Sequence, residues 1–152
     1  MLKPGDKAPA FALPDQSGGT VKLSDYKGRP VLVFFYPKAN TPGCTQQACG
    51  LRDAAVQAGE TAIVGISPDA PASQAKFDEK YSLGFPLLAD QDHSVADAYG
   101  VWAEKSMYGK VYMGIVRSAF LVDGRGRIAE AWYKVSPKDT AANLLRVVRA
   151  PS

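Results

Sequence analysis

Metal ligands are scarce in this chain, which holds one histidine and two cysteines. A closed zinc site needs four ligands of the cysteine or histidine type, and His93 is distant in sequence from both Cys44 and Cys49. The sequence therefore excludes a structural zinc centre built from these residues. We expect His93 to be a surface histidine, and we expect no metal or other cofactor.

Long apolar runs and blocks of like charge are also missing. No segment approaches the roughly 20 apolar residues that span a membrane, and residues 1–6 contain no apolar signal-peptide core. The net charge of +3 comes without a basic stripe, which favours an ordinary solvated surface over nucleic-acid binding. We therefore expect a cytoplasmic protein without a membrane or nucleic-acid partner. In that reducing compartment two cysteines are more often catalytic or metal-binding than a permanent cross-link.

Size and composition are typical of a single globular domain. The 152 residues are 46% hydrophobic and 22% charged, which allows a substantial core. Neither repeats nor low-complexity segments divide the chain. We expect residues 1–152 to form one domain.

Apolar patterning predicts strands that alternate with helices. The predicted strands are an N-terminal β-hairpin (10–13 and 20–23), buried strands at 31–36, 61–67 and 86–89, and a closing hairpin (117–122 and 127–133). The predicted helices are 45–59, 71–81, 95–99 and 137–149. The residues expected to face inward on the first and last of these helices are Ala48, Leu51, Ala55, Val56, Leu144, Leu145 and Val148. This order favours an α/β fold with a central mixed sheet flanked by helices.

Both cysteines follow the strand at 31–36 and a Pro/Gly turn. This order predicts a thiol, Cys44, at the N-terminal end of a helix. Unpaired N–H groups and a partial positive charge at that position stabilise a thiolate. We therefore expect Cys44 to be an acidic, nucleophilic thiol.

Helix geometry restricts how Cys44 and Cys49 can react with each other. In an intact α-helix, residues five apart are separated by about 7.5 Å along the axis and roughly 140° around it, which places their Cα atoms about 8.5–9 Å apart. That separation exceeds the ~7 Å limit for an unstrained disulfide. If both thiols lie in the helix, they can join only after its first turns unwind. Gly50 costs about 1 kcal/mol of helix propensity relative to Ala, and Thr45 is a mediocre helix former, so the sequence is consistent with a helix that opens readily.

Several uses of two thiols are open at this point. A structural disulfide is unusual in a cytosolic chain with an ample core. Copper binding by two thiols and a histidine is conceivable, although the spacing is wider than the C-x-x-x-C of thioredoxin-fold copper chaperones. A dithiol exchanger normally carries C-x-x-C, which is absent. The pattern favours a nucleophilic thiolate with a second thiol that traps its oxidised form. A thiol–disulfide exchanger and a redox-sensing or chaperone protein are the alternatives.

An activated thiolate also needs suitable neighbours. Thr41, three residues before the first cysteine, can turn its hydroxyl toward the sulfur or cap the helix. Pro37 ends the strand and can shield the thiol from water. A fixed cation is expected as well, and the candidates are Lys38, Arg52 and Arg117.

Residues 37–44 read P-K-A-N-T-P-G-C and fit the P-x-x-x-T-x-x-C signature of peroxiredoxins. The surrounding run, with F-Y-P before it and A-C-G-L-R-D after it, resembles the bacterioferritin comigratory protein (PrxQ) branch. Further similarity lies at 5–11, 65–69 and 108–123, so the resemblance covers nearly the whole chain.

The resemblance implies a thioredoxin-like fold and the reduction of hydrogen peroxide and organic hydroperoxides without a cofactor. It gives Cys44 as the peroxidatic cysteine and Cys49 as the resolving cysteine of the same chain, an atypical 2-Cys mechanism, with thioredoxin re-reducing the disulfide. It also implies that Thr41 and Arg117 activate the thiol and that Pro37 shields it.

The resemblance bears on two further features. Val116 precedes Arg117 at a position where many relatives carry a glutamate (M-G-I-E-R). The branch is often monomeric, and a resolving cysteine within the chain removes any need for a dimer, so we expect a monomer.

Overall fold

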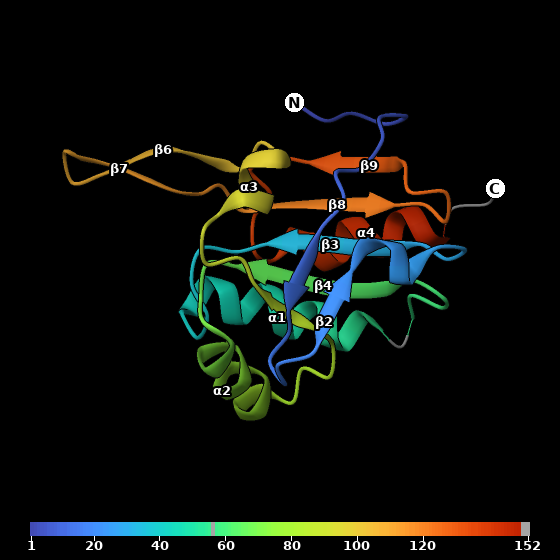
Figure 1. Cartoon of the computed structure of the whole chain (residues 1–152), viewed down its shortest axis with the longest axis horizontal. Helices are drawn as coiled ribbons and strands as arrows, with labels where there is room; N and C mark the ends of the chain where they lie inside the picture. The colour runs from blue at the N-terminus through green and yellow to red at the C-terminus, as the bar shows by residue number, and fades with distance from the viewer. Residues whose placement is uncertain (56, 150–152) are drawn as a thin grey trace.

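The computed structural model describes residues 1–55 and 57–149. At its centre is a five-stranded sheet with the order β5-β4-β3-β8-β9 (Figure 1). β3 (Val31–Phe35) pairs in parallel with β4 (Ala62–Ser67), and β4 pairs in parallel with β5 (Leu87–Ala89). On the other side, β8 (Ser118–Val122) runs antiparallel to β3, and β9 (Ile128–Trp132) runs antiparallel to β8. The predicted mixed sheet and closing hairpin are confirmed.

Alternate residues of β3 pack into two different cores. Val31, Val33 and Phe35 belong to a cluster that includes the N-terminal segment and α3 (Ser94–Ala98). Leu32 and Phe34 belong to the opposite cluster, formed with the three longer helices. Since both faces of the strand are covered, all five of its residues are buried, as expected of a continuous apolar run.

Three longer helices cover the second face; the first ends at Ala55, short of the predicted residue 59, and the last begins two residues later than predicted. They are α1 (Pro42–Ala55), α2 (Pro71–Tyr81) and α4 (Asp139–Arg149). α1 begins three residues earlier than predicted because proline suits the first helical position, where no N–H bond is required. The first intrahelical bond runs from Thr45 N–H to the Thr41 carbonyl, at 2.8 Å. Val56 and the side chain of Val148, both predicted to face inward, lie outside the described residues.

Two further hairpins complete the fold. β1 (Ala12–Pro14) and β2 (Thr20–Lys22) form the predicted N-terminal hairpin, followed by a 3₁₀ turn, η1 (Leu23–Tyr26). β6 (Trp102–Met107) and β7 (Lys110–Ile115) form a hairpin that was not predicted and that projects from the body of the molecule (Figure 1). No helix in the described part of the chain is long and apolar enough to cross a membrane.

The sheet register determines which residues meet at one of its ends. Phe35, the last residue of β3, pairs with Ser118, the first residue of β8. Arg117, immediately before β8, therefore lies at the same sheet edge as the loop that leaves β3. Because β4 runs parallel to β3, its carboxyl end reaches this edge as well.

Candidate active site

Cys44 is the third residue of α1, and its side chain is 1% exposed. The first N–H groups of a helix have no intrahelical acceptor and carry partial positive charge, so the sulfur lies in a field that favours an anion. The expected placement of this thiol at a helix N-terminus agrees with the structure.

Arg117 contacts the sulfur with two donors. Its Nη1 and Nη2 groups each lie 3.4 Å from Cys44 Sγ. Gly43 permits this approach, because a Cβ at that position would lie 3.0 Å from Nη2. A guanidinium held this close offers both charge and directed N–H groups to a thiolate or to a peroxide oxygen.

Gln47, which the sequence reasoning did not single out, holds the guanidinium. Arg117 Nη1 donates to Gln47 Oε1 at 2.7 Å, and the glutamine side chain is 0% exposed. A signal for it was present, because residues three apart on a helix are neighbours on its surface and Gln47 follows Cys44 by three. With valine at 116, the side-chain acceptor for this arginine comes from α1.

Of the other cation candidates, Arg52 is turned toward α2, where its Nη1 donates to the Tyr81 carbonyl at 2.6 Å and its Nε to Asp53 at 3.0 Å. Lys38 is exposed. Arg117 is therefore the candidate that reaches the sulfur.

The loop between β3 and α1 carries Pro37 and Thr41. Pro37 lies two residues after the end of β3 and is half-buried. The Thr41 hydroxyl donates its proton to the Lys38 carbonyl at 2.8 Å, so its proton is not directed at the sulfur and its lone pairs remain as acceptors. Asn40 adopts a left-handed conformation (φ 61°) that completes the turn into the helix.

A hydrogen-bond network joins this loop to the end of β4 and to α2. The Ala39 N–H donates to the Asp69 carboxylate at 2.7 Å, which also accepts from the Ser67 hydroxyl at 2.6 Å. Gln74 donates to the same hydroxyl at 2.8 Å and accepts from the Tyr36 hydroxyl. Burial raises the pKa of Tyr36, which keeps that donor protonated. The loop is thereby tied to the carboxyl end of β4.

Lys105 on β6 brings a second cation near the site. Its Nζ donates to the Ile115 carbonyl at 2.7 Å, two residues before Arg117. Burial lowers the pKa of Lys105, the charge of Arg117 lowers it further, and a Cys44 thiolate opposes both. Nothing in the sequence pattern pointed to this lysine, because its place depends on the unpredicted hairpin.

Cys49 lies partly buried in the same helix, and both cysteines are free thiols. Since α1 is continuous over both, the helical separation of about 8.5–9 Å between their Cα atoms applies. A disulfide between them therefore requires the helix to unwind.

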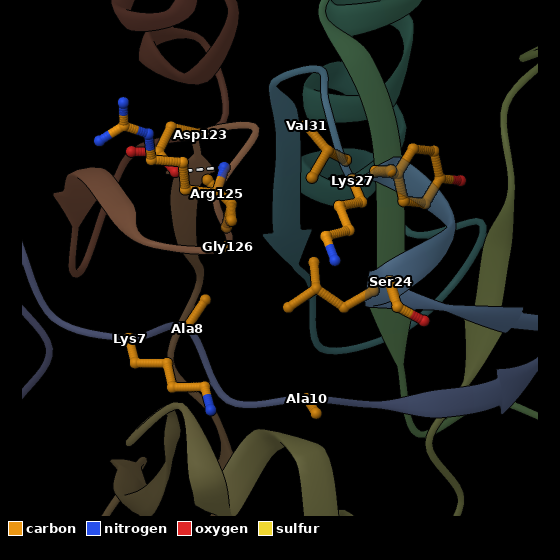
Figure 2. A pocket seen from close by; sticks show the side chains of 12 residues that line it. Lys7, Ala8, Ala10, Ser24, Lys27, Val31, Asp123, Arg125 and Gly126 are labelled. Carbon is orange, nitrogen blue, oxygen red and sulfur yellow. Dashed lines mark hydrogen bonds between the residues drawn. The ribbon is translucent and has the colours of Figure 1, made fainter.

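A cavity among the described residues lies elsewhere. Its volume is about 370 Å³, and it is lined by Val31 and Val122 at the opposite end of β3 and β8 from the thiol. Figure 2 shows Lys7, Lys27 and Arg125 around it. It shares no residue with the surroundings of the thiol described above, so this cavity is separate from the thiol site.

His93 contacts residues of α3 and β6. Its ring stacks on Trp102 with centroids 4.0 Å apart and bonds Asp97 at 2.9 Å. Over the residues that the structure covers, no three His, Cys, Asp or Glu side chains are grouped to hold a metal ion.

The sheet and the helices that cover it define a thioredoxin-like protein. The buried thiol beside Arg117 at a helix N-terminus is its candidate nucleophile. Comparison with known proteins gives the family. The AhpC/TSA family model matches residues 4–131. Peroxiredoxin Bcp of Escherichia coli is 54% identical, over 84% of this chain and 83% of that protein, and peroxiredoxin Bcp of Bacillus subtilis is 47% identical, over 95% and 94%.

A solved structure of the bacterioferritin comigratory protein of Xanthomonas campestris is similar throughout. It has a TM-score of 0.88 at 31% identity and covers 96% of this chain and 97% of that one. The chain therefore belongs to the AhpC/TSA family, and within it to the Bcp/PrxQ peroxiredoxins, which are thiol-dependent peroxidases. The predicted resemblance and thioredoxin-like fold are confirmed.

Proposed function

We propose that Cys44 is the peroxidatic cysteine of this enzyme and reduces hydrogen peroxide and organic hydroperoxides. The observation that carries the proposal is the buried Cys44 sulfur, held in the first turn of α1 against two donors of Arg117. The thiolate attacks the terminal peroxide oxygen and the O–O bond breaks. Sulfur is oxidised to sulfenic acid, and the departing hydroxide or alkoxide takes a proton to leave as water or alcohol.

The neighbouring residues have distinct roles in this step. Arg117 stabilises the thiolate and the negative charge that develops along the O–O bond. The Thr41 oxygen, whose own proton goes to Lys38, accepts a hydrogen bond from the hydroperoxide O–H. Pro37 shields the sulfur from bulk water.

Cys49 resolves the oxidised enzyme. After the first turns of α1 unwind, the Cys49 thiolate attacks the sulfenic sulfur and a disulfide forms within the chain. The S–O bond breaks, and the departing hydroxide takes a proton to leave as water. A thioredoxin-type dithiol then reduces this disulfide by exchange. We propose that the protein is a monomer of one domain, since both thiols of the cycle lie in one helix. We propose a cytoplasmic location because a thioredoxin-type reductant works in a reducing compartment. The proposal includes neither a nucleic-acid nor a membrane partner.

The organic hydroperoxide part of the proposal is supported by the Xanthomonas campestris protein, which is described as active in alkyl peroxide reduction. Its fold matches this chain over nearly its full length. The proposal extends that activity to this chain on the strength of the similarity and of the thiol site.

A peroxidase assay coupled to thioredoxin and its reductase, run with hydrogen peroxide and an alkyl hydroperoxide, tests these assignments. Cys44→Ser should abolish turnover. Cys49→Ser should consume one equivalent of peroxide and then stop. Turnover retained in Cys44→Ser, or thioredoxin-supported turnover retained in Cys49→Ser, would contradict the corresponding role.

A further inference from the structure

A buried chain of hydrogen bonds connects Cys44 to the C-terminal helix. Arg117 donates to Gln47 Oε1, and Gln47 Nε2 donates in turn to the Thr140 hydroxyl on α4 at 3.0 Å. That hydroxyl donates to the Ser136 carbonyl at 3.1 Å. Gln47 and Thr140 are 0% and 1% exposed, so water does not compete for these bonds.

The chemistry of its members sets the direction of this chain. A guanidinium has only donors, so the amide atom of Gln47 that faces Arg117 must be the oxygen. The amide nitrogen then faces Thr140 and needs an acceptor there. A hydroxyl supplies one, because its own proton is given to the Ser136 carbonyl. A side chain at 140 without an oxygen leaves a buried amide N–H unpaired.

α4 is packed closely enough against α1 to hold this bond in place. Gly43, Gln47 and Gly50 form a stripe at i, i+4 and i+7 on one face of α1. A Cβ at Gly43 would lie 3.5 Å from Pro137 Cγ, and one at Gly50 would lie 3.7 Å from Ala141 Cβ. α4 and the residues just before it thus lie against α1 on both sides of Gln47.

We propose that Thr140 is a positioning residue for the peroxidase reaction, acting through Gln47 to aim the Arg117 guanidinium at Cys44. The inference rests on the proposed function of the thiol. Thr140 accepts from the amide nitrogen and so holds the amide oxygen against the arginine, which keeps both nitrogens of the guanidinium on the sulfur. It touches neither the sulfur nor the peroxide.

The Gln47–Thr140 hydrogen bond also restrains formation of the disulfide between Cys44 and Cys49. Gln47 lies between the two cysteines, in the segment of α1 that must unwind, and its side chain must leave both Arg117 and Thr140 for the disulfide to form. Loss of the Thr140 hydroxyl should therefore affect the two half-reactions in opposite directions. Attack on peroxide becomes slower and disulfide formation becomes faster.

Thr140→Val tests the proposal, since it replaces the hydroxyl with a methyl group of similar size. Stopped-flow oxidation should give a rate constant for peroxide about tenfold lower than that of the natural protein. The pH profile of Cys44 alkylation, measured in a Cys49→Ser background, should move toward higher pH. Disulfide formation, followed in the two-cysteine protein, should become faster.

Three further variants separate positioning from general stability. Thr140→Ser keeps an acceptor and should restore the rate constant, whereas Thr140→Ala should repeat the defect by removing the same hydroxyl. Leu144→Ala creates a cavity beside α4, where Leu144 is fully buried, and should lower thermal stability without moving the alkylation profile. The proposal is overturned if neither Thr140→Val nor Thr140→Ala changes the rate constant or the profile, or if Leu144→Ala changes them equally. Because alkylation does not depend on turnover, these outcomes are distinct from failure of the proposed function, which active Cys44→Ser would reveal.

Discussion

Arg117 illustrates why the identity of single residues matters at this site. Its Nη1 donates to both Cys44 Sγ and Gln47 Oε1, while its Nη2 donates to the sulfur. A planar guanidinium can make these contacts at once because its donors point in fixed directions. An ammonium group is a compact charge on a flexible stem and cannot reproduce that geometry.

Arg117→Lys should therefore lower the rate constant for peroxide by about 10²- to 10³-fold, the usual effect of losing one oriented donor to a developing charge. Stopped-flow oxidation of the pre-reduced enzyme measures it directly. The matched control is Arg52→Lys, because Arg52 bonds Tyr81 and Asp53 instead. A loss smaller than tenfold in Arg117→Lys would show that positive charge alone is sufficient. An equal loss in both variants would show that the effect does not come from the contacts of Arg117 with Cys44.

At the level of secondary structure, the sequence predicted the elements that have a clear apolar period. The strands at 31–36 and 61–67 and the helix at 71–81 were found within one residue of the observed bounds. The β6–β7 hairpin was missed because it has little burial to impose a pattern, with Tyr108 97% exposed at its tip. Tyr108 and Gly109 both have positive φ (52° and 78°), as a two-residue type I′ turn requires, but Tyr-Gly is not a strong turn signal.

The candidate site was predictable where its residues are close in sequence. Pro37, Thr41, Cys44 and Cys49 lie in one segment, whose chemistry follows from a strand, a turn and a helix N-terminus. Contacts between distant segments were not predictable by the same reasoning. The Gln47–Thr140 bond joins residues 93 positions apart, and Arg117 was selected by resemblance, not by local pattern.

The helix that must unwind, α1, gives a prediction at this same level. Gly50→Ala should stabilise α1 by about 1 kcal/mol through its higher helix propensity. The new methyl group would lie 3.7 Å from Ala141 Cβ, an ordinary contact. Disulfide formation should become about fivefold slower, and a larger share of Cys44 should proceed to sulfinic acid under excess peroxide. Quenched-flow trapping and intact-mass measurement check both effects.

Ser73→Ala is the matched control for this change, since it raises helix propensity on the exposed face of α2, away from both cysteines. It should leave disulfide formation unchanged. If Gly50→Ala also left the rate unchanged, unwinding of α1 would not limit resolution.

At the scale of the whole molecule, the reduced and disulfide forms cannot share one structure. The reduced form keeps α1 whole, packed on β3 and α4. The disulfide form must give up the contacts of the Cys44–Cys49 segment, because the intact helix holds the two thiols too far apart. Oxidation therefore replaces the packing contacts of the Cys44–Cys49 segment with a disulfide bond inside that segment.

The stabilisation that the disulfide adds can be compared with the stabilisation lost when α1 unwinds. A disulfide that closes a loop of about six residues stabilises by about 2 kcal/mol in the chain-entropy description. Against it stand the charged Arg117–Gln47 bond, worth about 1.5–3 kcal/mol, and the Gln47–Thr140 bond, worth about 1 kcal/mol. Burial of Cys44 and Ala48 adds about 1 kcal/mol each. The losses exceed the gain by roughly 2–4 kcal/mol.

The oxidised enzyme should therefore unfold at a lower temperature than the reduced enzyme, by at least about 5 °C for a chain of this size. Differential scanning calorimetry of the two forms measures the shift, and hydrogen exchange should locate the added opening in α1 and at the start of α4. Cys49→Ser, which cannot form the disulfide, should show no such shift after treatment with one equivalent of peroxide. An oxidised form that unfolds at the same or a higher temperature would mean that the disulfide forms without loss of the Arg117–Gln47–Thr140 contacts, and that the two cysteines approach by a movement other than unwinding of α1.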